Sequence, residues 1–110
     1  MTDPLAQVET THDADRPVVR IRGEVDMANA DTVGDQIRAA TDPSHDLDLD
    51  LSTVTFFDSS ALRMLHRLSD AFDQAGGRLT VVIAPDSIVG RLLAITHMDT
   101  YLHLREEPTP

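Results

Sequence analysis

The stretch that decides the fold is "DLDLDLSTVTFFDSSALRML", residues 46–65. Its first half places leucine at every second position of 47–51, which indicates a β-strand with one apolar and one acidic face. Its second half changes to steps of three and four through Ala61, Leu65 and onwards to Phe72, which is typical of an amphipathic helix. An acid and two hydroxyls stand at the junction of the two patterns.

Similar patterns continue on both sides of this stretch. Strands are expected over 5–11, 18–22 (ended by Gly23), 79–83 and about 102–104. Asn29 is expected to cap a helix that ends in the turn at residues 42–44, and Gly76-Gly77 should end the helix that follows the junction. The apolar stripe of the Asn29 helix consists of Ala30, Val33, Ile37 and Ala40.

A third helix should open at Pro85-Asp86. The spacing predicts that Ile88, Leu92 and Ile95 point inward, with Val89 and Leu93 beside them.

This order of elements predicts one α/β domain over 5–105, between flexible ends at 1–4 and 106–110. The sheet should be mixed and mostly parallel, with four to five strands, three to four packed helices and an antiparallel edge near the N-terminus.

Composition limits the function. The chain has 110 residues, no cysteine and a net charge of −10, so disulfides and thiolate sites are excluded and nucleic-acid binding is disfavoured. The acidity serves solubility or attraction to a basic patch on a partner protein. Neither a signal peptide nor a membrane helix is recognisable, so we expect a cytoplasmic protein that binds no membrane.

The junction residues Asp58, Ser59 and Ser60 allow three interpretations. Asp58 can cap the helix that follows it. A catalytic serine is disfavoured, because no nucleophile-elbow motif surrounds the pair and no histidine stands at a motif spacing from it. His66 falls on the polar side of the helix and is expected to be solvated. The third possibility is that a hydroxyl in the exposed first turn accepts a phosphate, which a helix N-terminus favours.

No cofactor or metal site is expected. The aspartates of 46–50 resemble the start of a calcium loop, but Leu51 and Phe57 occupy the positions where that loop needs glycine and a bidentate acid. Zinc motifs, phosphate-binding loops and dinucleotide-binding motifs are also missing, so an enzyme is not indicated.

Three blocks in series resemble the STAS domain, a family named for sulphate transporters and anti-sigma factor antagonists. They are "GEVD" at 23–26, "LDLSTVTFFDSSAL" at 49–62 and "GGRLTVV" at 76–82. Together they span nearly the whole chain, from about Val18 to Leu104.

The resemblance implies an anti-sigma factor antagonist. Its unphosphorylated form would bind an anti-sigma factor that is also a serine kinase, and so free the sigma factor. The kinase would phosphorylate Ser59 and a serine phosphatase would reverse this. The partner-binding residues implied by the family are Asp26, Asp58, Ser59, Ser60, Ala61 and Arg63.

Two positions depart from the family pattern. Ala61 stands where glycine is usual, so the resemblance implies that the added methyl group weakens docking or selects a different kinase. Asp48 stands in a strand that is usually apolar, which suggests that its face of the sheet is open or lies near a partner. The alternative function is a constitutive STAS subunit of a transporter ATPase complex or a stress-signalling assembly.

Overall fold

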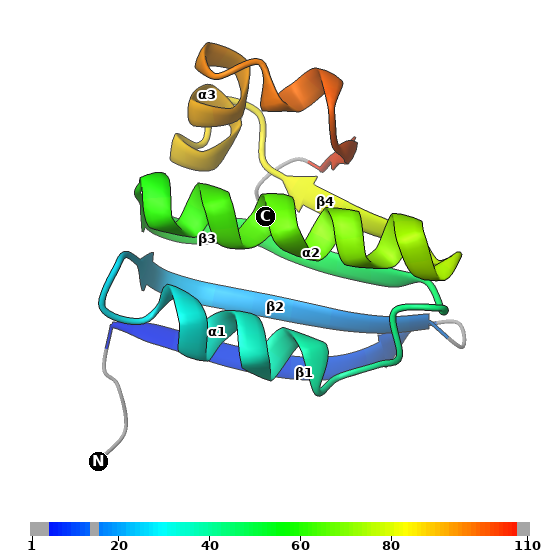
Figure 1. Ribbon diagram of the computed structural model, residues 1–110. Coiled ribbons are helices and arrows are strands. Elements are labelled where there is room, and N and C mark those ends of the chain that lie inside the picture. The colour runs from blue at the N-terminus through cyan, green and yellow to red at the C-terminus, as the bar shows by residue number, and fades with distance from the viewer. Residues whose placement is uncertain (1–4, 14–15, 108–110) are drawn as a thin grey trace.

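The computed structural model describes residues 5–13 and 16–107 of the chain. Within these residues, five strands and three α-helices follow one another, with one short 3-10 helix near the C-terminal end (Figure 1). In chain order they are β1 (Ala6–Asp13), β2 (Arg16–Val25), α1 (Ala30–Arg38), β3 (Leu47–Phe57), α2 (Ser59–Ala75), β4 (Leu79–Ile83), α3 (Ile88–Ile95), η1 (Met98–Thr100) and β5 (His103–Glu106).

The strands form one sheet in the order β1-β2-β3-β4-β5. Strand β1 runs antiparallel to β2, with Val8 opposite Ile21, whereas β2 to β5 are parallel to one another. The predicted mixed, mostly parallel sheet with an antiparallel N-terminal edge is therefore confirmed.

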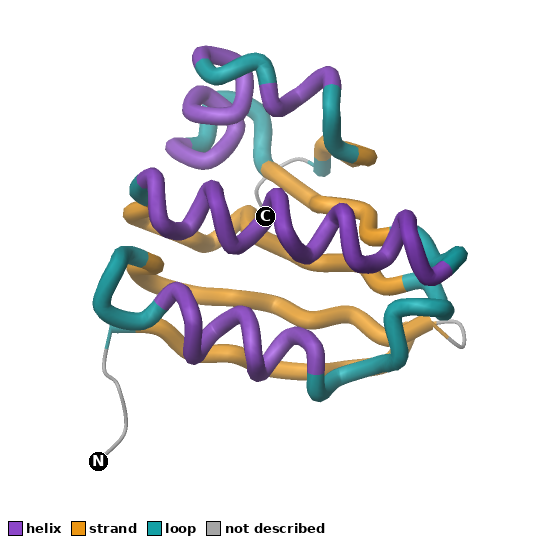
Figure 2. Tube along the Cα trace, in the orientation of Figure 1, coloured by secondary structure: helices purple, strands orange, loops and turns teal. Residues whose placement is uncertain are grey.

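The helices cover one face of this sheet. Because the parallel strands follow the same order in the sheet and in the sequence, crossovers of one hand place their helices on one side. Figures 1 and 2 show α1 and α2 lying alongside each other across that side. The core lies between the layers, and its fully buried members include Ile21, Leu49, Leu51, Leu65 and Phe72.

Gly34 lets the two helices pack closely. A Cβ atom at this position of α1 would lie 3.0 Å from Cγ of Met64 on α2. The low helix propensity of glycine is therefore offset by tight packing between the helices.

Strand β2 does not end at Gly23, as the sequence predicted, but continues to Val25. Gly23 has a φ of 96°, and the register with β3 shifts just beyond it. A Cβ atom here would lie 2.1 Å from the carbonyl oxygen of Leu5, so glycine permits the close approach of β1.

Helix α3 begins later and faces differently from the prediction. Ser87 is its N-cap residue, since the Ser87 hydroxyl accepts a hydrogen bond from the Gly90 N–H at 3.1 Å. Val89 and Leu93 are fully buried, whereas Ile88 and Ile95 are 50% and 75% exposed. Val89 and Leu93 therefore form the buried side of α3, although the prediction placed them only beside the inward-pointing residues.

The second face of the sheet carries ion pairs. Asp48 is 5% exposed and Asp50 is 9% exposed, although both are charged. Asp48 contacts Arg16 and Arg105, and Asp50 contacts Arg20. The acidic face of β3 predicted from the alternation is present, but arginines from neighbouring strands cover it.

The described part of the chain ends at Glu107. Glu106 belongs to β5, and the Glu107 N–H donates to the carbonyl oxygen of Ile83 at 2.9 Å. The rest of the predicted flexible ends, 1–4 and 108–110, lies outside the described residues. Among the helices of 5–13 and 16–107, none combines the length and the apolar character that crossing a bilayer requires.

Candidate functional site

Helix α2 starts directly after β3, and Asp58 is the residue between them. Its backbone is extended, with φ −102° and ψ −171°, and its Oδ1 atom accepts a hydrogen bond from the Ala61 N–H at 3.0 Å. Asp58 is therefore the N-cap of α2, as the sequence predicted, and one free N–H of the first turn is satisfied.

Ser59 is the first residue of α2, and its side chain is exposed. Ser60 is half-buried, and Arg63 lies exposed one turn further along. Within the described residues, neither serine hydroxyl makes a hydrogen bond and Arg63 makes no ion pair. The structure thus places the predicted phosphate acceptor at the surface, on a helix turn that also carries a cation.

Ala61, in contrast, is fully buried. Its methyl group faces the core and not the solvent, so it cannot contact a partner as the family pattern implied. The expectation that this methyl weakens docking is therefore wrong in its physical basis.

The loop between β2 and α1, residues 26–29, lies against this junction (Figure 2). Asn29 precedes α1 as predicted, but its side chain does not cap the helix. Its Oδ1 atom accepts from the Asp26 N–H and its Nδ2 group donates to the carbonyl oxygen of Glu24, both at 2.9 Å. Asn29 is 3% exposed, so it fixes the loop from inside.

Asp58 joins this loop to α2. Its second carboxylate oxygen, Oδ2, accepts a hydrogen bond from the Met27 N–H at 3.0 Å. Asp26, predicted as a partner-binding residue, is half-buried, and its Oδ1 atom accepts from the Ala28 N–H at 2.9 Å. The structure therefore brings together two predicted segments that are about thirty residues apart in sequence.

Met27 was not predicted. It is 84% exposed, although it is a large apolar residue. In the sequence it is a single large apolar residue in a short loop, so no periodicity marks it; its only signal is its position directly after the "GEVD" block.

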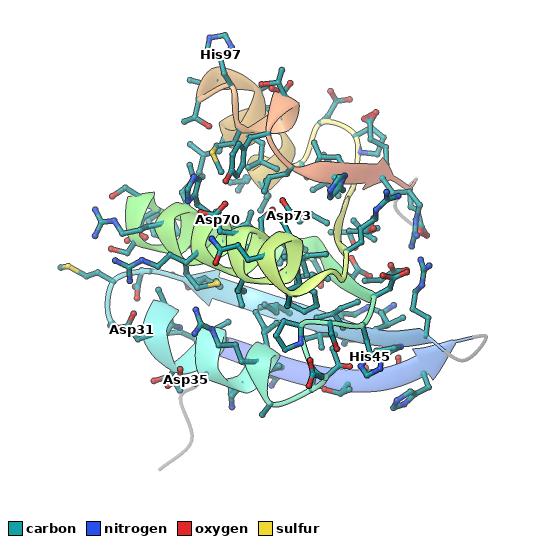
Figure 3. All side chains as sticks on the ribbon, turned by 45° about the vertical axis from the view of Figure 1, so that its right-hand side comes forward. Asp31, Asp35, His45, Asp70, Asp73 and His97 are labelled. Carbon is teal, nitrogen blue, oxygen red and sulfur yellow. The ribbon has the colours of Figure 1, made fainter. Side chains whose placement is uncertain are left out.

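Charges of both signs lie on the nearby surface. Figure 3 shows Asp31 and Asp35 pointing outward from α1, the helix that follows the loop. Arg38 and Arg67 line the same hollow as these two aspartates.

His66 on α2 is not merely solvated, as the sequence suggested. Its ring stacks on Tyr101 with centroids 4.6 Å apart, and its Nδ1 atom lies 3.5 Å from Oδ2 of Asp70. The Tyr101 hydroxyl donates to Asp70 as well. These residues attach the C-terminal segment to α2, and among the described residues no hydrogen bond or ion pair joins His66 to either serine.

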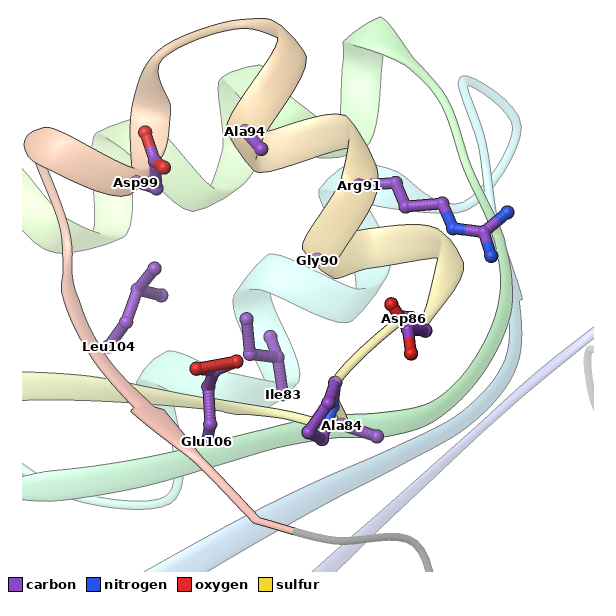
Figure 4. A pocket seen from close by; sticks show the side chains of 10 residues that line it. Ile83, Ala84, Asp86, Gly90, Arg91, Ala94, Asp99, Leu104 and Glu106 are labelled. Atoms are coloured by element: carbon purple, nitrogen blue, oxygen red, sulfur yellow. The ribbon is translucent and has the colours of Figure 1, made fainter.

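Two further observations bear on chemistry. In the part of the chain that the structure describes, no cluster of three histidine or acidic residues could hold a metal ion. A cavity of about 450 Å³ lies between β4, α3 and β5, over the apolar residues Ile83, Ala84 and Leu104 (Figure 4). Ser59 does not line it. The candidate acceptor is thus on an open surface rather than in a substrate pocket.

Comparison with known proteins gives a consistent result. The matching family model is described as "Mlab, STAS domain" and covers residues 8–106. An anti-sigma factor antagonist from Mycobacterium paratuberculosis superposes with a TM-score of 0.79 at 25% identity, over 94% of this chain and 89% of that one.

Two further solved structures show the same fold. A putative anti-sigma factor antagonist from Thermotoga maritima has a TM-score of 0.74 at 21% identity, over 91% of this chain and 86% of that one. An anti-sigma-factor antagonist (STAS) domain protein from Planctomyces limnophilus has a TM-score of 0.71 at 21% identity, over 93% and 91%.

Proposed function

The chain belongs to the STAS domain family, and on that basis we propose that it is an anti-sigma factor antagonist controlled by phosphorylation of Ser59. The unphosphorylated chain binds an anti-sigma factor that is also a serine kinase, and this binding releases the sigma factor. Phosphorylation by the kinase ends the binding, and a serine phosphatase restores it.

One observation carries this proposal. Ser59 is an exposed hydroxyl at the first position of α2, and it is next to the carboxylate that holds the 26–29 loop. A kinase can reach such a hydroxyl, and a phosphate placed there lies in the middle of the surface formed by the two segments. The likeness to the antagonist structure from Mycobacterium paratuberculosis supports the same function.

Electrostatics explain how the phosphate would end binding. It adds about −1.5 to −2 charges beside Asp58, on a chain whose net charge is already −10. Binding would press this dianion and Asp58 into the interface, so the complex would lose the hydration of both charges, a cost of several kcal/mol that the free chain does not bear. A loss of even about 3 kcal/mol weakens a complex more than a hundredfold.

The fold itself should tolerate the phosphate. An anion at a helix N-terminus is stabilised by about 0.3–1 kcal/mol, because the helix dipole is positive there. In this proposal the chain performs no chemistry of its own, since the kinase and the phosphatase supply both reactions. It is a binding switch.

The proposal is tested with purified anti-sigma factor kinases from the organism that encodes the chain. Incubation with a kinase and ATP, followed by phosphopeptide mapping, should find the phosphate on Ser59. Ser59→Ala should bind the kinase permanently, and Ser59→Asp should bind it poorly. Ser60→Ala is the matched control and should leave phosphorylation in place.

Equal affinity of the two Ser59 variants would contradict the switch. Stable association with a transporter ATPase or a signalling scaffold, indifferent to Ser59 phosphorylation, would instead support the constitutive STAS subunit.

A further inference from the structure

Met27 is the most exposed large apolar side chain of the described residues, at 84%. Side chains of this kind at a surface are common singly, but this one stands beside the phosphate acceptor rather than at a remote position. Its backbone N–H is bound by Asp58, the residue immediately before Ser59. An apolar group is therefore presented to solvent at the centre of the proposed docking surface.

The loop that carries Met27 is fixed at every residue. Asp26 and Asn29 exchange side-chain and backbone hydrogen bonds with their neighbours in the loop, and the Ala30 N–H closes it by donating to the carbonyl oxygen of Asp26 at 2.8 Å. The buried side chain of Asn29 also ties the loop to β2 through Glu24. A side chain on such a loop loses little backbone freedom on binding, which favours affinity.

The two carboxylate oxygens of Asp58 accept hydrogen bonds from two different segments. Oδ1 caps α2 through the Ala61 N–H, and Oδ2 holds the Met27 N–H, each at 3.0 Å. The position of the exposed methionine is thus set by the residue that precedes Ser59.

We propose that Met27 is the apolar anchor of the docking surface, and that Asp58 is the residue that positions it. The partner surface it fits is an apolar pocket bordered by basic groups, because Met27 directly follows Asp26, its N–H donates to Asp58, and the chain as a whole has a net charge of −10. This inference rests on the proposed function and names the surface through which the anti-sigma factor would be bound.

The first test compares two exposed apolar residues. Met27→Ala should weaken binding to the purified anti-sigma factor kinase about 10- to 100-fold, as expected when a buried methionine is truncated. Met27→Leu should retain most of the affinity. Ile95→Ala is the matched control: it removes a 75% exposed apolar side chain from α3, and affinity should not change.

The second test isolates the role of Asp58. Asn has one acceptor oxygen, so Asp58→Asn can keep the cap on Ala61 but cannot also accept from the Met27 N–H. We expect the Met27 amide to exchange with solvent about tenfold faster, measured by NMR on the free protein, while the Ala61 amide keeps its protection. Binding should weaken as well.

The outcomes separate the two proposals. If the wild-type chain binds the kinase and Met27→Ala binds equally well, the anchor is wrong and the proposed function stands. If the Met27 amide is unaffected by Asp58→Asn, Asp58 does not position the loop. If the wild-type chain binds none of the purified kinases, the proposed function fails and the anchor fails with it.

Discussion

Arg105 and Asp48 are 57 positions apart in the sequence, yet an Nη2 atom of Arg105 lies 3.0 Å from Oδ2 of Asp48. Strand β4 lies between their two strands, so the guanidinium reaches across a whole strand of the sheet. On the other side Arg16 contacts the same carboxylate at 3.2 Å. One buried acid therefore joins β2, β3 and β5 on the face that no described helix covers.

Asp48→Ala should therefore lower the free energy of unfolding by about 1–3 kcal/mol, because Arg16 and Arg105 lose the buried carboxylate to which they donate. Urea unfolding measures this. Asp46→Ala is the control: Asp46 contacts the same Arg16 at 3.5 Å, but its side chain is 52% exposed. We expect a cost of about 0.5 kcal/mol or less there. Equal costs would mean that burial of the pair is unimportant.

The neighbouring acid, Asp50, should make stability depend on pH. Burial would raise the pKa of Asp50, but hydrogen bonds from the hydroxyl and backbone N–H of Ser52, and from Arg20, outweigh burial and lower it. A carboxylate with a lowered folded pKa contributes stability above the ordinary aspartate pKa of about 4, and this is lost as pH falls through the folded value.

Urea unfolding from pH 6 down to pH 3 should consequently show a smaller loss of stability for Asp50→Asn than for the wild-type chain. Identical slopes for the two proteins would show that Asp50 does not contribute.

Strand β3 and helix α2 could be predicted because their patterns are unambiguous. The leucines of β3 alternate with polar residues, and α2 has a polar face, so each pattern fits only one orientation. Helix α3 has apolar residues on nearly every side, so spacing alone could not distinguish the buried Val89 and Leu93 from the exposed Ile95.

Contacts between residues distant in the sequence could not be predicted, for a different reason. Arg105 can be paired with Asp48 only when the strand order is known, and the same holds for the hydrogen bond from Met27 to Asp58. Asp58 and Ser59 themselves could be placed, since a change from strand to helix spacing is a local signal. The burial of Ala61 agrees with its place on the apolar stripe of α2 beside Leu65, and only the family resemblance suggested that its methyl group meets a partner.

Two adjacent glycines should respond differently to substitution. Gly76 ends α2 with a φ of 93°, and a Cβ atom there would meet no atom within 4 Å. Gly76→Ala should therefore cost only the backbone strain of about 1–2 kcal/mol. At Gly77 a Cβ atom would lie 2.3 Å from the carbonyl oxygens of His45 and Pro43, so the backbone must move.

We expect Gly77→Ala to cost about 3 kcal/mol or more in urea unfolding. Gly76→Asn is a useful control, because asparagine tolerates the left-handed conformation and should cost less than alanine. A cost at Gly77 no larger than that at Gly76 would contradict the close contact with the 43–45 turn.

Phosphorylation of Ser59 should leave the fold nearly as stable as before. The phosphate would sit at the N-terminus of α2, where the dipole favours an anion, and Arg63 stands exposed one turn further on without an ion pair in the described residues. Repulsion from Asp58 opposes these gains. We therefore expect the free energy of unfolding of the chain that carries phosphoserine at position 59 to stay within about 1 kcal/mol of that of the unmodified protein. Urea unfolding measures this.

Arg63→Gln should lower the stability of the phosphorylated chain more than that of the unmodified chain. A phosphorylated chain that unfolds, or loses its native spectrum, would mean that partner binding ends through loss of structure instead of through the phosphate on an intact surface.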